Sequence, residues 1–259
     1  MGKLYLVILL CLLTGSTFSQ ELEPRKNGAF QPGEKLTYKL KYGFLTAAEA
    51  TLEVQETDVK FDNKPVFHLV AQGKTSGSFD IFYKVRDRYD SYIDKTELTP
   101  YLYTENIRES NYRRTDHVRF YQEQKKIVGE KGTFKGVNPT FDLISAYYFA
   151  RSLDLTNISP GDKIRMNYFL KDEVSPFEIQ YVGKERIKTP LGYFNCLKFS
   201  PTIQAGRIFK KDSKLYLWIT DDGNRIPVKA QVEILLGSVT LEIQDATGMK
   251  YPSTATDKK

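Results

Sequence analysis

The chain has 259 residues, of which 41% are hydrophobic and 27% are charged, and its formal net charge is +6. These values are typical of a soluble globular protein, and the mixing of basic with acidic residues excludes a nucleic-acid-binding footprint. Aromatic residues reach 13%, almost all of them Tyr and Phe, which favour β-strands.

The first 19 residues predict a cleaved signal peptide. Lys3 provides the positive start, residues 4–13 form an apolar stretch, and Thr17-Phe18-Ser19 offers the small residues of a cleavage site. The apolar stretch is too short to span a bilayer. We therefore expect cleavage near Ser19-Gln20, export to the periplasm, and no transmembrane segment in the mature protein.

The cysteines predict no disulfide. Cys11 lies inside the signal peptide, and Leu10 stands where lipid attachment would need a small residue. Cys196 then remains alone, in a strand-like setting that favours a buried, unreactive thiol. With two distant histidines, His68 and His117, neither a catalytic thiol pair nor a zinc site is predicted. No glycine-rich phosphate loop or nucleophile elbow is present, so no cofactor is expected.

The rest of the chain predicts one domain. Residues 20–29 are expected to be a flexible leader, residues 30–246 a single β-rich domain, and residues 247–259 a polar tail, since no linker divides the chain. Apolar and polar residues alternate in 36–42 and 47–54, which predicts a hairpin turning at Gly43, with lysines facing glutamates. Further strands are predicted at 65–73, 83–92, 101–107, 112–121, 125–131, 165–170, 177–188, 193–199, 213–220, 227–236 and 238–244.

One segment predicts a helix. Residues 141–153, FDLISAYYFARSL, are apolar on nearly every side of a helical wheel, which is typical of a fully buried helix. Thr140 or Asp142 can cap its first amides. The expected fold is mainly β: a large curved antiparallel sheet or half-open barrel of about a dozen strands around one buried α-helix at about 140–153.

A charged strand and a turn invite functional interpretations. Alternation in residues 83–92 places Arg86, Arg88 and Asp90 on one face. They could form an anion or headgroup site or a ladder of cross-strand ion pairs, and the ladder is favoured. His68 alternates with valines and is interpreted as a strand residue rather than a ligand. The sequence Asp221-Asp222-Gly223-Asn224 predicts a hairpin turn rather than a calcium loop.

Several blocks carry a family resemblance. They are Phe30-x-Pro-Gly-Glu-x-Leu-x-Tyr38, Gly43, Ala48-Glu49-Ala50, and residues 83–94, 142–148, 206–209 and 218–229. Over about residues 28–246 the chain resembles the exported domain-of-unknown-function family 3108. The resemblance implies a periplasmic, mostly β protein of Gram-negative bacteria and assigns no catalytic residues. The expected shape is also similar to that of periplasmic lipoprotein carriers, whose curved sheets hold acyl chains.

Three functional hypotheses follow. The first is a non-enzymatic envelope protein that binds a lipid or lipoprotein acyl chain. Its cavity would be lined by Tyr147, Tyr148 and Phe149, and its headgroup site would be Arg86 and Arg88. The second is an interaction or scaffold protein that docks an envelope protein through its sheet edges or its 79–94 face. The third is an envelope hydrolase with paired carboxylates, for which the candidates are Asp87, Asp90 and Glu105.

Overall fold

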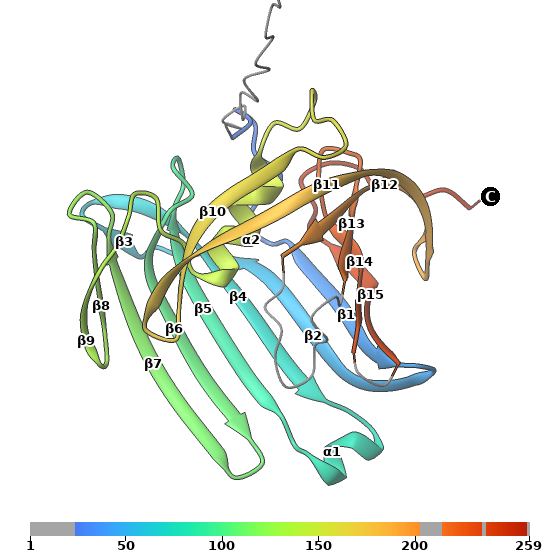
Figure 1. The fold of residues 1–259 in the computed structure, drawn as a ribbon, viewed down its shortest axis with the longest axis horizontal. Helices are drawn as coiled ribbons and strands as arrows, with labels where there is room; N and C mark the ends of the chain where they lie inside the picture. Colours follow the sequence, from blue (N-terminus) through green and yellow to red (C-terminus); the bar gives the residue numbers. More distant parts are fainter. Residues whose placement is uncertain (1–23, 203–213, 235–236, 258–259) are drawn as a thin grey trace, which may run out of the picture.

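The computed structural model describes residues 24–202, 214–234 and 237–257. The expected signal peptide at residues 1–19 and the family block at 206–209 lie outside these residues. The described part folds as one large antiparallel sheet of 15 strands with two short helices, α1 (Ser78–Phe82) and α2 (Leu143–Ser152) (Figure 1). The expected mainly β fold is confirmed, whereas α1 was not predicted.

The strands follow the chain almost continuously. They are β1 (Lys35–Tyr42), β2 (Leu45–Gln55), β3 (Lys60–Phe61), β4 (Lys64–Thr75), β5 (Arg86–Asp94), β6 (Pro100–Glu109), β7 (Tyr112–Tyr121), β8 (Lys126–Gly129), β9 (Gly132–Lys135), β10 (Lys163–Leu170), β11 (Glu173–Thr189), β12 (Gly192–Pro201), β13 (Leu215–Thr220), β14 (Pro227–Glu233) and β15 (Ser238–Thr247).

The sheet is open, and its strand order is β10-β11-β12-β13-β14-β15-β1-β2-β4-β5-β6-β7-β8-β9, with β3 paired to β4. Apart from the short β3 between β2 and β4, neighbours in the sheet are neighbours along the chain except where β15 returns to β1, so this pairing joins the two halves. The edge strand β10 is covered by Phe141, whose N–H donates to Asn167 O at 2.8 Å and whose carbonyl accepts from Phe169 N at 2.8 Å.

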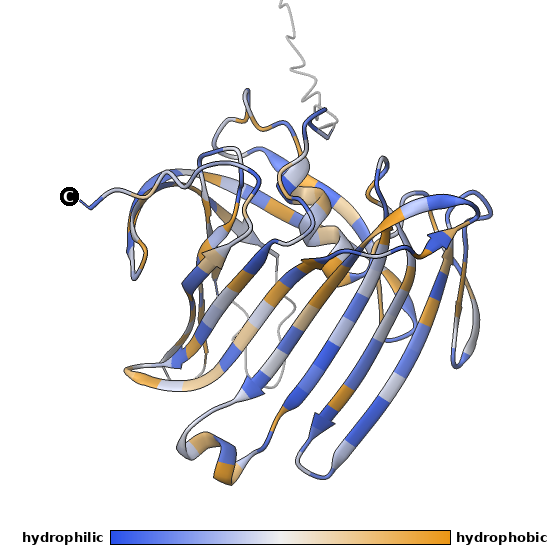
Figure 2. Cartoon of the chain, turned by 180° about the vertical axis from the view of Figure 1, so that it is seen from behind, coloured by the Kyte–Doolittle hydropathy of each residue, from blue (hydrophilic) through white to orange (hydrophobic). Residues whose placement is uncertain are grey.

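The first hairpin forms as its sequence predicts. Strands β1 and β2 pair antiparallel, and Lys35 Nζ lies 2.9 Å from Glu53 Oε1. Leu36 and Tyr38 are buried, as the alternation requires, but Tyr42 at the end of β1 is 40% exposed. Figure 2 shows hydrophilic and hydrophobic residues alternating along many of the strands, as expected for a sheet with one face packed and one face in water.

Helix α2 lies between the two halves of the sheet. Its residues Ile144 and Tyr148 belong to a core cluster with Leu69 of β4 and Ile93 of β5. A second core cluster joins Ala146 of α2 to residues of β10, β11 and β12. The apolar faces of both halves are therefore buried against one helix, which is why the sheet curves around it.

The helix begins at a strong cap. The Asp142 carboxylate accepts hydrogen bonds from Ile144 N at 2.8 Å and Ser145 N at 2.9 Å, and Ser145 Oγ accepts from Asp142 N at 2.9 Å. This reciprocal arrangement is a capping box, and it selects Asp142 over Thr140 as the N-cap. The prediction of burial on every side needs one correction, because Leu143 is 52% exposed. It is the first residue of α2, where the sheet no longer covers the helix.

Both terminal segments contact the domain where they are described. Arg25 N–H donates to Ser152 O at 2.7 Å, and Ala29 is fully buried, so the described part of the expected leader contacts the end of α2. In the polar tail, Thr256 pairs with Tyr193 in an antiparallel bridge. These contacts place the tail and the leader around the same end of the helix as the loop between β13 and β14.

Candidate functional site

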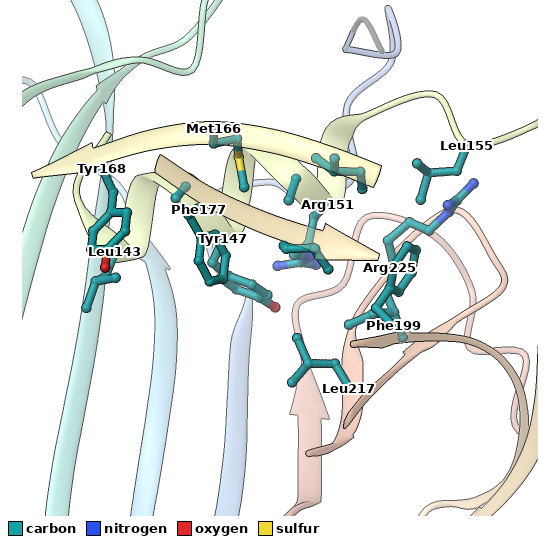
Figure 3. A pocket seen from close by; sticks show the side chains of 15 residues that line it. Leu143, Tyr147, Arg151, Leu155, Met166, Tyr168, Phe177, Phe199, Leu217 and Arg225 are labelled. Carbon is teal, nitrogen blue, oxygen red and sulfur yellow. The ribbon is translucent and has the colours of Figure 1, made fainter. Parts of the chain in front are cut away.

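An apolar cavity of about 200 Å³ lies between α2 and the C-terminal half of the sheet (Figure 3). On the sheet side it is lined by Met166, Tyr168, Phe177, Phe199, Leu217 and Ile219. On the helix side it is lined by Leu143, Ala146, Tyr147, Ala150 and Arg151. Two further residues, Leu155 and Arg225, lie together at one end. Carbon atoms form most of this surface, so the cavity suits an apolar group.

The cavity exists because one face of α2 carries small side chains. Ala146 and Ala150 are four residues apart and therefore lie one above the other on the same helix face. Neither reaches far enough to fill the space between the helix and Met166 or Phe177. Leu143 shares this face one turn earlier, and because its side chain is half exposed, the cavity reaches the surface there.

Arg151 is the charged residue of α2, and its charge is fully compensated. Its Nη1 and Nη2 lie 2.6 Å and 2.9 Å from the two carboxylate oxygens of Glu34, and Nη2 also donates to Asn224 O at 2.8 Å. The side chains of Arg151 and Glu34 are 1% and 0% exposed. This bidentate pair is the strong, directional type, and it fixes α2 against β1 and the β13–β14 loop.

The three predicted cavity residues are consecutive on α2, so their side chains point in different directions. Tyr147 lines the cavity. Tyr148 faces the N-terminal half of the sheet, where its ring lies 4.8 Å from that of Phe30. Phe149 packs against Phe141 with their ring centroids 4.7 Å apart. Of the three aromatic residues, only Tyr147 therefore lines this cavity.

The predicted headgroup residues lie elsewhere. On β5, Ser91 Oγ donates to Asp142 at 2.7 Å and so faces α2, which turns the side chains of Arg86 and Arg88 to the opposite face. Arg88 lies 2.7 Å from Asp90, and Arg86 is likewise 2.6 Å from an aspartate of α1. The structure does not bring these arginines to the cavity. Both are ion-paired, but Arg88 pairs within its own strand and Arg86 pairs with α1, so they do not form the expected cross-strand ladder.

His68, predicted to be a strand residue rather than a ligand, lies on the same face of the sheet as Arg88 and Asp90. His68 Nε2 lies 2.7 Å from Asp90 Oδ1, and its ring stacks on Tyr92 with their centroids 4.3 Å apart. Within residues 24–202, 214–234 and 237–257, no group of three or more His, Cys, Asp and Glu side chains is arranged to hold a metal ion.

A second cavity, of about 270 Å³, lies beside β6 and β7. Glu105 and Asp116 are directly opposite each other across these strands and are both buried. Arg114 lies 2.7 Å from Glu105 and 2.8 Å from Asp116, so one cation holds both carboxylates. Of the hydrolase candidates only Glu105 lines this cavity, because Asp90 faces outward and Asp87 accepts a hydrogen bond from a backbone N–H of β6.

Of the residues that line the apolar cavity, sequence reasoning found Tyr147 and missed the others. The alanine spacing at 146 and 150, inside an otherwise bulky helix, was a usable signal for a hollow face. Arg225 gave no such signal, because it follows a turn and its neighbours in space come from distant parts of the chain.

The fold and the cavity define a class of β-rich proteins in which an open, curved antiparallel sheet surrounds one helix. The family model described as "Protein of unknown function (DUF3108)" matches residues 37–244, and the chain belongs to this family. No match was found among curated proteins. In the described part of the chain, neither helix is long and apolar enough to cross a membrane.

Several solved structures are similar to this chain at low identity, and the one with a TM-score above 0.5 shares its fold. A β-barrel-like protein of the DUF1849 family from Brucella abortus aligns with a TM-score of 0.55 and 7% identity, over 82% of this chain and 96% of that one. A Bacteroides fragilis protein assigned as exported, with a YmcC-like fold, gives 0.35 and 12%, over 85% and 98%. A Parabacteroides distasonis protein assigned as a lipoprotein gives 0.38 and 11%, over 85% and 97%.

Proposed function

We propose that this chain is a non-enzymatic exported protein of the cell envelope that binds an apolar or amphipathic ligand, such as a lipid or a lipoprotein acyl chain. The observation that carries the proposal is the apolar cavity beside α2. Export to the periplasm is proposed from the signal-peptide pattern of residues 1–19 and from the family resemblance.

The size of the cavity limits the ligand. Cavities of about 150 Å³ lined by aliphatic and aromatic residues stay dry and accept benzene, whereas drug-sized ligands occupy about 300–1,000 Å³. A cavity of about 200 Å³ lies between these values. The bound group is therefore a short apolar chain or one end of a longer chain, with the remainder leaving at the half-exposed Leu143.

A cavity-filling variant tests the proposal. Ala150→Phe places a ring in the cavity, and Tyr148→Phe, on the opposite side of the same helix, is the matched control. Protein purified from the cell envelope is examined by native mass spectrometry and lipid extraction, and then by titration with the neutral probe N-phenyl-1-naphthylamine. We expect a bound apolar molecule and probe binding for the wild type and the control, and loss of both for Ala150→Phe. A wild-type protein that carries no ligand and binds no probe would refute the proposal.

A second candidate function, an envelope interaction protein, is favoured by a separate surface. Phe44 in the β1–β2 turn is 93% exposed, and Ile81 and Phe82 of α1 are 83% and 84% exposed. Large apolar side chains exposed this fully often mark a contact site. A photo-crosslinker placed at residue 82, compared with one at Lys39 on β1, would recover one abundant envelope protein if this candidate is right. Equal recovery of many proteins at both positions would argue against it.

A further inference from the structure

At the end of the apolar cavity nearest Leu155 lies an arginine that has no ion-pair partner among the described residues. Arg225 lines the cavity, is 8% exposed, and in Figure 3 its guanidinium lies beside Leu155. Its Nε donates to Asp222 O at 3.1 Å, but its Nη1 is buried without an acceptor. In the described part of the chain no carboxylate forms an ion pair with it. By contrast, Arg151, which lines the same cavity, has acceptors for all of its guanidinium nitrogens.

A second arginine adds to this excess of positive charge. Arg25 Nη2 donates to Gly223 O at 2.9 Å, two residues from Arg225, and Arg25 Nε is also buried without an acceptor. Burial, and then the nearby charge of Arg25, lower the pKa of Arg225. An arginine nonetheless stays charged in proteins. Two cations with unused donors therefore lie close together, and one of them, Arg225, lines the apolar cavity.

The acidic residues around this corner are engaged with other groups. Asp221 lies 2.7 Å from Lys184 Nζ. Asp222 accepts hydrogen bonds from backbone and hydroxyl donors of its own loop and from the C-terminal segment. Asp154 accepts both the N–H and the hydroxyl of Thr156. The charges of Asp221, Asp222 and Asp154 raise the pKa of Arg225, but in the described structure none of them accepts a hydrogen bond from its Nη1.

We propose that Arg225, assisted by Arg25, binds the anionic head of an amphipathic ligand whose apolar part lies in the cavity beside α2. This inference rests on the proposed function and adds the chemistry of the head group. Guanidinium donors suit carboxylate and phosphate oxygens, and a site of low dielectric strengthens such hydrogen bonds. The chain of the ligand would run along α2 from Leu155 towards Tyr168 and Leu143, which Figure 3 shows at the other end of the cavity.

Three probes of equal chain length distinguish the contribution of the head group to affinity from that of the apolar chain. They are octanoate, octyl phosphate and octanol, each titrated calorimetrically into the purified full chain. We expect at least one anionic probe to bind about tenfold or more tightly than octanol, since a charge-assisted hydrogen bond contributes at least this much. Preference for octanoate would identify a carboxylate ligand, and preference for octyl phosphate would identify a phosphate ligand.

Arginine variants test which side chain causes the preference for the anionic probes over octanol. Arg225→Gln should remove it while leaving the affinity for octanol unchanged, which also shows that the variant folds. Arg25→Gln should weaken it, and Arg88→Gln, whose side chain is paired with Asp90 on the other face of the sheet, should change nothing. Equal binding of octanol and both anions would overturn the head-group proposal and leave the apolar cavity intact. Binding of none of the three would overturn both proposals.

Discussion

Removing the charge of Glu34 is expected to destabilise the protein strongly. Its carboxylate accepts two short hydrogen bonds from Arg151, and both side chains are excluded from water. Glu34→Gln keeps the shape but leaves a buried guanidinium with a neutral partner. Breaking a buried pair in this way costs about 3–5 kcal/mol, a large part of the ~5–15 kcal/mol that stabilises a typical domain.

The assay is urea unfolding followed by the fluorescence of Trp218, the one tryptophan of the chain, together with circular dichroism. Glu49→Gln is the control, because Glu49 pairs with Lys74 at 3.0 Å on the surface and should contribute less than about 1 kcal/mol. Replacing both buried partners, as Glu34→Leu with Arg151→Met, should recover most of the loss, since neither charge then remains unpaired. If Glu34→Gln costs no more than the surface control, the account of how α2 is held is wrong.

Three further predictions concern local sites. Asp142→Ala removes the helix cap and the partner of Ser91, and should cost about 2 kcal/mol in urea unfolding; a cost below about 0.5 kcal/mol would contradict the capping role. Burial, followed by nearby acidic charge, raises the pKa of Cys196 to about 12, so its thiol should resist a disulfide reagent at pH 8 until the protein is unfolded; rapid reaction of the native protein would disprove this. Hydrogen bonding to Arg86 lowers the pKa of Asp80 to about 2, so this ion pair stabilises the fold above the ordinary carboxyl pKa and is lost as the pH falls through about 2. NMR titration should show this midpoint rise in Arg86→Gln, and an unchanged midpoint would exclude the pairing.

Local patterns made the elements predictable. The alternation around Leu36 and Tyr38 gave a strand because burial of one face requires a period of two. The position of Asp142 before an apolar run gave the start of α2, since its carboxylate can reach the free amides. The strand order was harder to obtain, because β15 pairs with β1 across some 200 residues and no local pattern encodes that contact.

The candidate site was only partly predictable for the same reason. Tyr147 was expected from the apolar helix and lines the cavity. The single charge of that helix, Arg151, was a visible signal of a buried partner, but Glu34 lies 117 residues away in sequence. Arg86 and Arg88 were predicted as headgroup ligands because their segment is rich in charge. Such a segment also contains acidic residues, and the two arginines pair with these instead. Arg225, by contrast, keeps a buried guanidinium nitrogen without an acceptor in the described structure.

The unfilled space beside α2 agrees with the proposed role in binding. The side chains that line this space lack packing partners on one side, which costs dispersion energy. A leucine at position 146 or 150 would remove much of this cost, and both positions lie on a helix where leucine is favourable. The cost cannot be assigned to weak anchoring of α2, because its cap and its buried ion pair hold the helix firmly on the other sides. The proposed ligand would occupy this space, recover the lost contacts and use the unused arginine donor at one end.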